Sequence, residues 1–271
     1  MTTAMALIHV NFFSETLGMS SQLEVVLPQR AAGQIGVGQT EESREIPVLY
    51  LLHGMTDNHT TWGRNTCIER YASELGFAVV MPNGHLGWYT DMKNGYDYYT
   101  YIAHEVPAVC ERFFPRLSRR REGRFVAGNS MGGYGAVKLA LSRPDFFRAA
   151  ASLSGGLDVT DTVRRRESGF RANLWEDIFG PADEVAGSEN DLFALAEKIA
   201  RESRVQDAPK LWLWCGTEDF LYHQNTKMRD HLNALGFAPV WREEPGDHSW
   251  RCWEPQLPAM LGWMNAIWKG E

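Results

Sequence analysis

Cysteine is scarce in this sequence of 271 residues and is never found in a paired spacing. The four cysteines, Cys67, Cys110, Cys215 and Cys252, form no C-x-x-C motif. Disulfide frameworks and zinc sites both depend on such spacings. The sequence therefore suggests neither of them, and we expect no metal.

Long apolar runs and an excess of positive charge are also absent. No apolar stretch approaches the roughly 18 residues of a membrane-spanning helix. Met1–Phe13 has no basic region, and His9 and Asn11 interrupt it, so it does not resemble a signal peptide. With 27 Lys and Arg against 34 Asp and Glu, the net charge is −7, which offers no electrostatic case for nucleic-acid binding. We expect a cytoplasmic protein that binds neither membranes nor nucleic acid.

Hydrophobic residues make up 44% of the chain, enough for one large core, and their pattern alternates between strands and helices. Apolar runs predict strands at residues 6–13, 22–27, 48–52, 77–81, 124–127, 147–153, 210–214 and 239–242. Helices are expected at residues 65–75, up to 114, 135–141, 221–235 and 250–268, and a surface loop at 30–45. The first two strands are expected to form an antiparallel edge pair. Such alternation predicts a doubly wound, mostly parallel α/β sheet.

One stretch interrupts this alternation. Residues 156–204 carry no strand signal, but Leu192, Leu195, Ala196 and Ile199 recur at the spacing of an amphipathic helix. We interpret the stretch as a small helical cap inserted into a single domain that covers residues 1–271.

A serine near the middle of the chain has the surroundings of a nucleophile. Gly128-Asn129-Ser130-Met131-Gly132 has the G-x-S-x-G spacing, with a predicted strand before it and a predicted helix after it. The two glycines remove side chains that would collide at a sharp turn, so the Ser130 hydroxyl can project above the sheet. The pentapeptide alone is weak evidence, because turns are rich in glycine and serine. Its strand–turn–helix context favours a catalytic role.

Two more groups follow later strands, at the sheet edge where functional residues of such folds gather. Asp219 and His248 complete the chain order serine, acid, histidine of the α/β-hydrolases. His248 would accept the Ser130 proton, and Asp219 would hold the imidazole in the required tautomer. Glu218 lies in the same loop as Asp219 and stays open as the alternative acid.

Two backbone N–H groups are expected to form the oxyanion hole. This fold takes one from the residue after the nucleophile, here Met131, and one from the loop after an early strand. His53-Gly54-Met55 is that loop, so Met55 is the second expected donor.

Aromatic side chains are dense in the loops that should surround Ser130. Trp88, Tyr89, Trp175 and Trp250 are the candidate substrate-binding residues. If two or three of them touch the substrate, their rigid rings leave a small acyl pocket. The alternative is that several belong to the core, since Trp250 and Trp253 are three residues apart on a helix that must bury one face.

These motifs together resemble the esterase D family of α/β-hydrolases, which includes S-formylglutathione hydrolases, tributyrin esterases and mycolyltransferase-like members. The resemblance covers about residues 6–268. It is carried by Leu51-Leu52-His53-Gly54, Pro82-Asn83-Gly84, the sequence from Gly128 to Ala136, Cys215-Gly216-Thr217-Glu218-Asp219, and His248 with Trp250 and Trp253. The run Trp88-Tyr89-Thr90-Asp91 is most similar to bacterial tributyrin esterases.

The resemblance implies a serine carboxylesterase that needs no cofactor and acts on short acyl groups, acetyl to butyryl, including acetyl groups on carbohydrates. Because such relatives are often oligomeric, it also implies a homo-oligomer. S-formylglutathione hydrolase or another thioesterase is the alternative, although the cysteine usual there after the oxyanion glycine is absent between Met55 and Trp62. A non-catalytic binding protein of the same fold is a third interpretation.

Overall fold

The computed structural model describes residues 4–29, 35, 45–165, 173–202 and 204–271. Most of the predicted 30–45 loop lies outside the described residues. The strands are β1 (Met5–Ser14), β2 (Met19–Pro28), β3 (Val48–Leu52), β4 (Ala78–Pro82), β5 (Arg124–Asn129), β6 (Ala149–Leu153), β7 (Lys210–Gly216) and β8 (Val240–Glu244). The helices are α1 (Thr61–Asn65), α2 (Ile68–Leu75), α3 (Tyr98–Thr100), α4 (Val106–Phe113), α5 (Met131–Ser142), α6 (Val159–Arg164), α7 (Leu174–Phe179), α8 (Ala182–Val185), α9 (Leu192–Arg201), α10 (Tyr222–Ala234), α11 (Trp250–Trp253) and α12 (Leu257–Lys269).

The strands form one eight-stranded sheet in the order β1-β2-β4-β3-β5-β6-β7-β8. β3 to β8 are parallel, and β1 and β2 form the expected antiparallel pair at the edge. This is the predicted doubly wound α/β-hydrolase fold. The strand ends are in register, with Leu52 beside Gly128 and Leu153 beside Trp214. The loops after β3, β5, β6 and β7 therefore emerge at one edge of the sheet.

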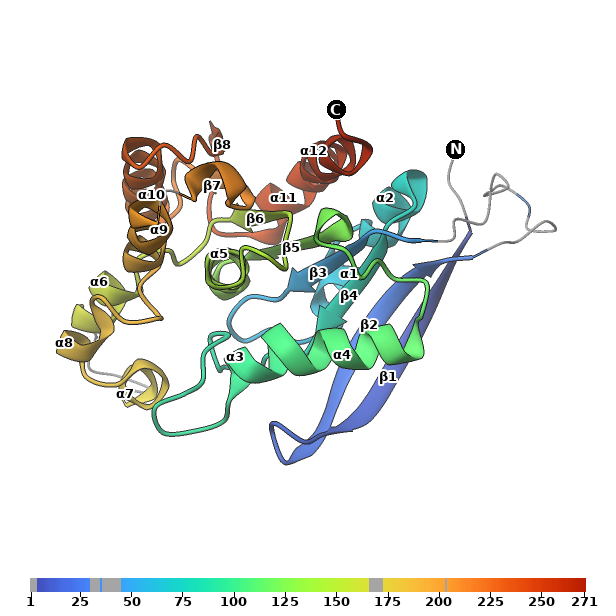
Figure 1. The fold of residues 1–271 in the computed structure, drawn as a ribbon, viewed down its shortest axis with the longest axis horizontal. Helices are drawn as coiled ribbons and strands as arrows, with labels where there is room; N and C mark the ends of the chain where they lie inside the picture. The colour runs from blue at the N-terminus through green and yellow to red at the C-terminus, as the bar shows by residue number, and fades with distance from the viewer. Residues whose placement is uncertain (1–3, 30–34, 36–44, 166–172, 203) are drawn as a thin grey trace.

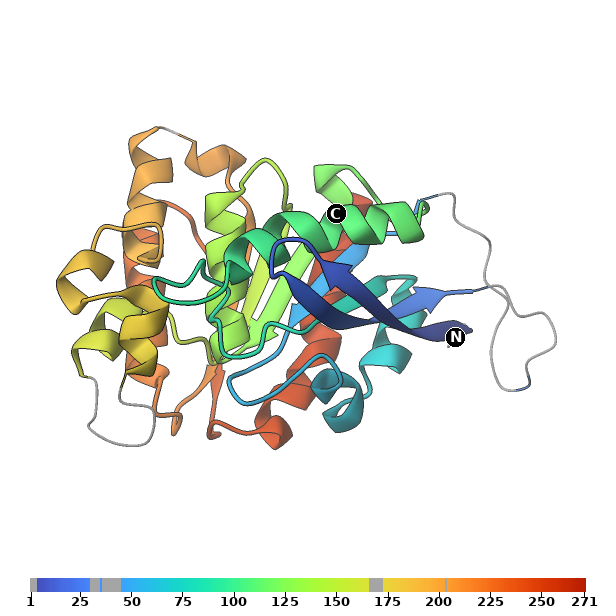
Figure 2. The same cartoon turned by 90° about the horizontal axis from the view of Figure 1, so that it is seen from below.

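Helices cover both faces of the sheet (Figures 1 and 2). On β5, Val126 points into the core under α4, α5, α9 and α10, while Phe125 and Ala127 point into the core under α2 and α12. These residues are fully buried, as the continuous apolar run of a central parallel strand predicts.

The segment between β6 and β7, which we call the insertion, contains helices and no strand in its described part. The predicted amphipathic helix is α9, which buries Leu192, Ala196 and Ile199. α6, α7 and α8 lie at the end of the molecule away from β1 and β2 in both views (Figures 1 and 2).

Prolines explain two differences from the predicted helices. The predicted helix at 250–268 is divided into α11 and α12 by a 3₁₀ turn at Glu254–Gln256, because Pro255 has no N–H for the helical ladder. Pro107 is the second residue of α4, and α4 directly follows a π-helical turn at Tyr101–Glu105. The third difference concerns the helix predicted at residues 65–75: in the structure α1 ends at Asn65 and a separate helix, α2, begins at Ile68.

No helix in the described ranges is long and apolar enough to cross a membrane.

Candidate active site

Ser130 occupies a strained turn between β5 and α5. Its φ of 53° and ψ of −118° lie outside the regions that L-residues prefer. A Cβ on Gly128 would lie 2.4 Å from the carbonyl carbon of Gly132, and a Cβ on Gly132 would lie 2.3 Å from the Leu52 oxygen. Glycine is therefore required at both positions. The surrounding backbone holds the turn, since the Ser130 N–H donates to Leu153 O at 2.9 Å and its carbonyl accepts from Gly156 N at 3.2 Å.

His248 contacts both of its predicted partners. Its Nε2 lies 2.9 Å from the Ser130 Oγ, and its Nδ1 lies 2.8 Å from Oδ2 of Asp219. Because a carboxylate can only accept, Nδ1 carries the proton, which leaves Nε2 free to accept the serine hydroxyl proton. The three side chains lie in the arrangement that nucleophile activation requires.

Of the two carboxylates that the sequence leaves open, Asp219 is the one that His248 contacts. The Asp219 side chain is 0% exposed, and its other oxygen accepts from the Leu221 N–H at 2.8 Å. Glu218 is exposed and accepts from the Thr217 hydroxyl. Asp247 also points elsewhere: Ser249 and Arg251 donate to it and lower the pKa of this carboxyl to about 2.

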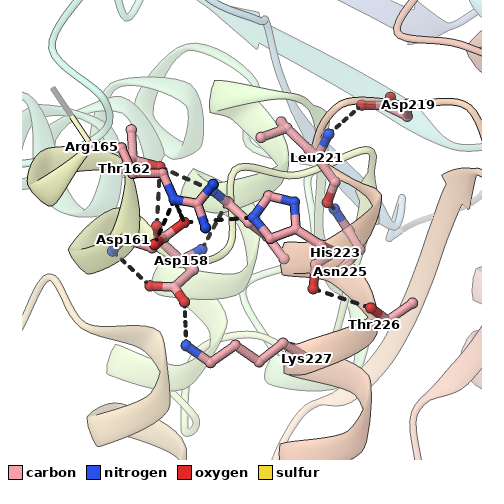
Figure 3. Close-up of polar contacts among 11 residues, drawn as sticks. Asp158, Asp161, Thr162, Arg165, Asp219, Leu221, His223, Asn225, Thr226 and Lys227 are labelled. Atoms are coloured by element: carbon pink, nitrogen blue, oxygen red, sulfur yellow. Dashed lines mark hydrogen bonds and ion pairs between the residues drawn. The ribbon is translucent and has the colours of Figure 1, made fainter. Parts of the chain in front are cut away.

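Asn225, near the start of α10, connects the loop that carries Asp219 to the loop after β6. Asn225 is fully buried, and its Nδ2 donates to Leu221 O and Gly155 O, both at 2.9 Å. It thereby joins the Asp219 loop to the segment that caps the Ser130 carbonyl. Figure 3 shows the next contacts outward, where Lys227 meets Asp158 of the insertion at 2.5 Å.

His53 fixes the loop that carries Met55. Its Nδ1 donates to Gly54 O at 2.8 Å, and its Nε2 accepts from the Gly84 N–H at 2.9 Å. These two contacts require the neutral ring with the proton on Nδ1. Burial favours the same form and lowers the pKa of His53 to about 4. Met131, the other expected oxyanion donor, is the first residue of α5, where backbone N–H groups have no intrahelical acceptor.

Trp88 and Trp175 belong to an aromatic cluster between the insertion and α5, the helix that follows Ser130. The Trp88 ring lies 4.9 Å from Trp175, 5.6 Å from Tyr134 and 5.9 Å from Phe179, measured between centroids. We call these four residues the cap cluster. Trp88 also reaches the nucleophile turn, because a Cβ on Gly156 would lie 3.0 Å from its Cη2. The structure thus places Trp88 beside Gly156, whose N–H donates to the Ser130 carbonyl, and packs Trp175 against Trp88.

Tyr89 and Trp250, the other two predicted substrate-binding residues, pack among other side chains and support residues of the site. The Tyr89 side chain is 0% exposed and its hydroxyl donates to His53 O at 2.9 Å, so it supports the Met55 loop and has no face open to a substrate. Trp250 packs between Trp62 at 4.8 Å and Trp253 at 5.2 Å, and it is Trp253 that contacts the His248 ring.

Phe220 was not among the predicted site residues. The residue is 68% exposed, and its ring centroid lies 4.5 Å from that of His248. An exposed aromatic ring against His248 is available to a bound molecule. The only signal in the sequence is its position next to Asp219.

The described residues contain no group of three or more His, Cys, Asp and Glu side chains that could hold a metal ion.

A serine on a strand-to-helix turn of an α/β-hydrolase sheet, in contact with a histidine, defines the class of serine hydrolases. Within this class the chain belongs to the esterase family described as "Putative esterase", whose model matches residues 14–264.

Individual relatives agree with this assignment. An acetyl esterase from Caldicellulosiruptor saccharolyticus is 27% identical over 268 residues, which cover 97% of this chain and 99% of the relative. The substrate-bound structure of fluorophosphonate-binding serine hydrolase F from Staphylococcus aureus is 34% identical, with a TM-score of 0.86 over 96% of this chain and 98% of that one. An S-formylglutathione hydrolase from the same organism is also 34% identical, with a TM-score of 0.84 over 97% of this chain and 100% of that one.

Proposed function

We propose that this esterase is a serine carboxylesterase that hydrolyses short-chain acyl esters through an acyl-enzyme intermediate. The observation that carries the proposal is the continuous contact from Ser130 Oγ through the His248 ring to Asp219, with distances of 2.9 and 2.8 Å.

In the first half of the reaction, the Ser130 oxygen attacks the ester carbonyl while His248 Nε2 takes the hydroxyl proton. Asp219 stabilises the imidazolium that forms. The tetrahedral intermediate collapses when Nε2 gives the proton to the departing alcohol oxygen, which leaves the acyl group on Ser130. A water molecule then repeats the sequence, releasing the carboxylic acid and restoring the serine.

The negative charge on the carbonyl oxygen would be stabilised by the Met55 and Met131 backbone N–H groups. The Met55 N–H can act in this way only if its loop is rigid. His53 stabilises that loop through hydrogen bonds of its two ring nitrogens with Gly54 O and Gly84 N. Each such donor contributes roughly 3–4 kcal/mol to transition-state stabilisation by analogy with other serine hydrolases.

The cap cluster supports a preference for small acyl groups. Trp88, only 5% exposed, closes the space beside Gly156 with a rigid ring held by three other aromatic rings. We propose that Trp88 and Trp175 form the acyl-side wall and that Phe220, whose ring contacts His248, lies on the side where the alcohol leaves. One methylene group in such a pocket changes the transition-state free energy by about 1–3 kcal/mol.

S-formylglutathione hydrolysis is the second candidate, favoured by the 34% identity to the staphylococcal enzyme of that name. The same nucleophile and base would serve a thioester. The acetyl esterase, which is 27% identical, favours oxygen esters.

A panel of p-nitrophenyl esters tests the proposal, with S-formylglutathione measured beside it. We expect kcat/KM to be highest between acetate and butyrate and to fall at least about tenfold at octanoate. Ser130→Ala serves as the control and should abolish turnover of every ester. Values that still rise at decanoate would contradict a small acyl pocket, and a strong preference for S-formylglutathione would favour the second candidate.

A further inference from the structure

Lys138 is a buried amine that the proposed reaction does not use. It lies on α5, the helix that begins at the nucleophile, and the whole residue is 2% exposed. Desolvation lowers the pKa of its ammonium group to about 7, with Glu189 and Asp91 acting in the opposite direction. A lysine is rarely buried to this extent unless its polar head has partners.

The partners of Lys138 come from two different segments. Its Nζ donates to Thr90 Oγ1 at 2.6 Å and to Asn190 Oδ1 at 2.5 Å. Thr90 belongs to the loop between β4 and α3, residues 83–97, which we call the aromatic loop. Asn190 belongs to the insertion, between α8 and α9. Two N–H groups suffice for these contacts, so the amine can make them in either protonation state.

The Thr90 contact lies next to the strained part of the aromatic loop. Trp88 and Tyr89 have φ values of 49° and 51°, in the left-handed region that non-glycine residues seldom adopt. Such a conformation persists only where the surroundings hold it. Tyr89 is held by its hydrogen bond to His53 O, and Thr90, which is 0% exposed, is held by Lys138.

The Asn190 contact fixes the other side of the cap cluster. The Asn190 carbonyl accepts from the Tyr134 hydroxyl at 2.9 Å, while its side chain accepts from Lys138 and from the Thr90 hydroxyl, the latter at 3.0 Å. Tyr134 and Lys138 are one helical turn apart on α5. One face of the nucleophile helix therefore holds the insertion and the aromatic loop together.

Packing does not hold this region alone. A surface pocket of about 470 Å³ borders Lys138 and is lined by Tyr99, Ser142 and Glu189 among others. Side chains that border such a pocket have packing partners on fewer sides than side chains in the core. The hydrogen bonds of Lys138 bridge the segments beside this pocket.

We propose that Lys138 is a positioning residue for acyl selectivity: through Thr90 and Asn190 it clamps Trp88 and the insertion onto the nucleophile helix and so sets the size of the acyl pocket. The inference rests on the proposed function, because it takes the Trp88 wall as the acyl side. Lys138 itself does not touch the reacting atoms.

The matched pair Thr90→Val and Thr90→Ser tests the clamp. Valine has nearly the shape of threonine but no hydroxyl, whereas serine keeps the hydroxyl. We expect Thr90→Val to raise the ratio of kcat/KM for octanoate to that for butyrate about tenfold, and Thr90→Ser to keep the wild-type ratio. Lys138→Met should act like Thr90→Val. A purely structural loss would lower the rates for all esters alike and leave this ratio unchanged.

Amide hydrogen exchange over residues 84–99 gives a second readout that does not depend on turnover. We expect faster exchange there in Thr90→Val than in wild type or Thr90→Ser. An unchanged ester ratio together with unchanged exchange would overturn the clamp, even if Lys138→Met failed to fold. Wild-type protein that hydrolysed no ester would overturn the proposed function, and the exchange comparison would still decide whether Lys138 holds the aromatic loop.

Discussion

At the scale of single residues, the site depends on one exact orientation of the His248 ring. Asp219 fixes this orientation because both of its oxygens are committed, one to His248 Nδ1 and one to the Leu221 N–H. Without an acceptor at Nδ1, the imidazole could place its proton on Nε2, and it could then no longer accept the proton of Ser130.

This gives a direct comparison of the two neighbouring carboxylates. Asp219→Asn should lower kcat on p-nitrophenyl acetate on the order of 10⁴-fold, because an amide favours the wrong tautomer. Glu218→Gln is the matched control and should stay near wild type, since the Glu218 side chain points to solvent. A larger loss in Glu218→Gln than in Asp219→Asn would mean that the acid has been misassigned.

Several residues of the site could be predicted from the sequence, and others could not. Ser130, Asp219 and His248 follow β5, β7 and β8 in chain order, so the topology of the parallel sheet brings them to one edge. The contact of Phe220 with His248 depends on the path of a short loop, and the burial of Tyr89 depends on two left-handed residues in the aromatic loop. The periodicity of apolar residues in the sequence predicts neither the Phe220 contact nor the burial of Tyr89.

At the scale of elements, the crossing of α5 over the end of β3 leaves no room for a side chain at Gly132. A Cβ there would meet the backbone oxygens of Leu52 and His53 at 2.3 and 2.8 Å, and neither can move away without shifting the Met55 loop. The end of β3, the turn at Ser130 and the loop that carries Met55 are therefore packed directly against one another.

Gly132→Ala should accordingly destabilise the protein by at least about 3 kcal/mol, the upper range for overpacking. Gly262→Ala provides the contrast, because Gly262 is exposed on α12 with nothing within 4 Å of its Cβ position. There alanine should stabilise by about 1 kcal/mol through helix propensity. Urea unfolding measures both, and equal effects of the two substitutions would contradict the close approach at Gly132.

The loop after β3 should also make the fold sensitive to acid. The pKa of His53 is about 4 in the folded protein and 6.5 when unperturbed, so the unfolded chain binds a proton first as the pH falls. The stability is complete above about pH 6.5 and is lost on the way down to about pH 4, by roughly 3 kcal/mol at 1.36 kcal/mol per pKa unit.

Urea unfolding between pH 7 and pH 4 measures this loss in wild type and in His53→Asn, which cannot take up the proton. Stability should fall more steeply with pH in wild type than in the variant. Parallel curves would show that His53 is not held neutral by burial.

At this scale, helix boundaries are the feature that the sequence predicts least well. The sheet follows from apolar runs with turns between them, and the strand positions were predicted well. The π-helical turn before Pro107 and the break around Pro255 reflect local hydrogen bonding that periodicity does not record.

At the scale of the whole molecule, the sheet brings together loops that are far apart in the chain. The insertion and the aromatic loop meet over α5, joined by backbone hydrogen bonds from Lys93 N to Ile178 O and from Asn94 N to Asp177 O. A second aromatic group lies against His248, where Trp253 contacts the histidine ring and Trp250 and Trp62 pack behind it. Two aromatic groups from different parts of the chain therefore contact this region, one through Trp88 and one through Trp253, which is consistent with the separate acyl and alcohol sides proposed above.

The most direct measurement is the site of covalent labelling by a fluorophosphonate, since such a probe reacts with an activated serine. Intact mass spectrometry should show the addition of one probe molecule to wild type, and peptide mapping should place it on Ser130. Ser130→Ala should stay unlabelled, and His248→Ala should label far more slowly because the base is gone. A label on any other residue, or equal labelling of Ser130→Ala, would contradict Ser130 as the nucleophile of this esterase.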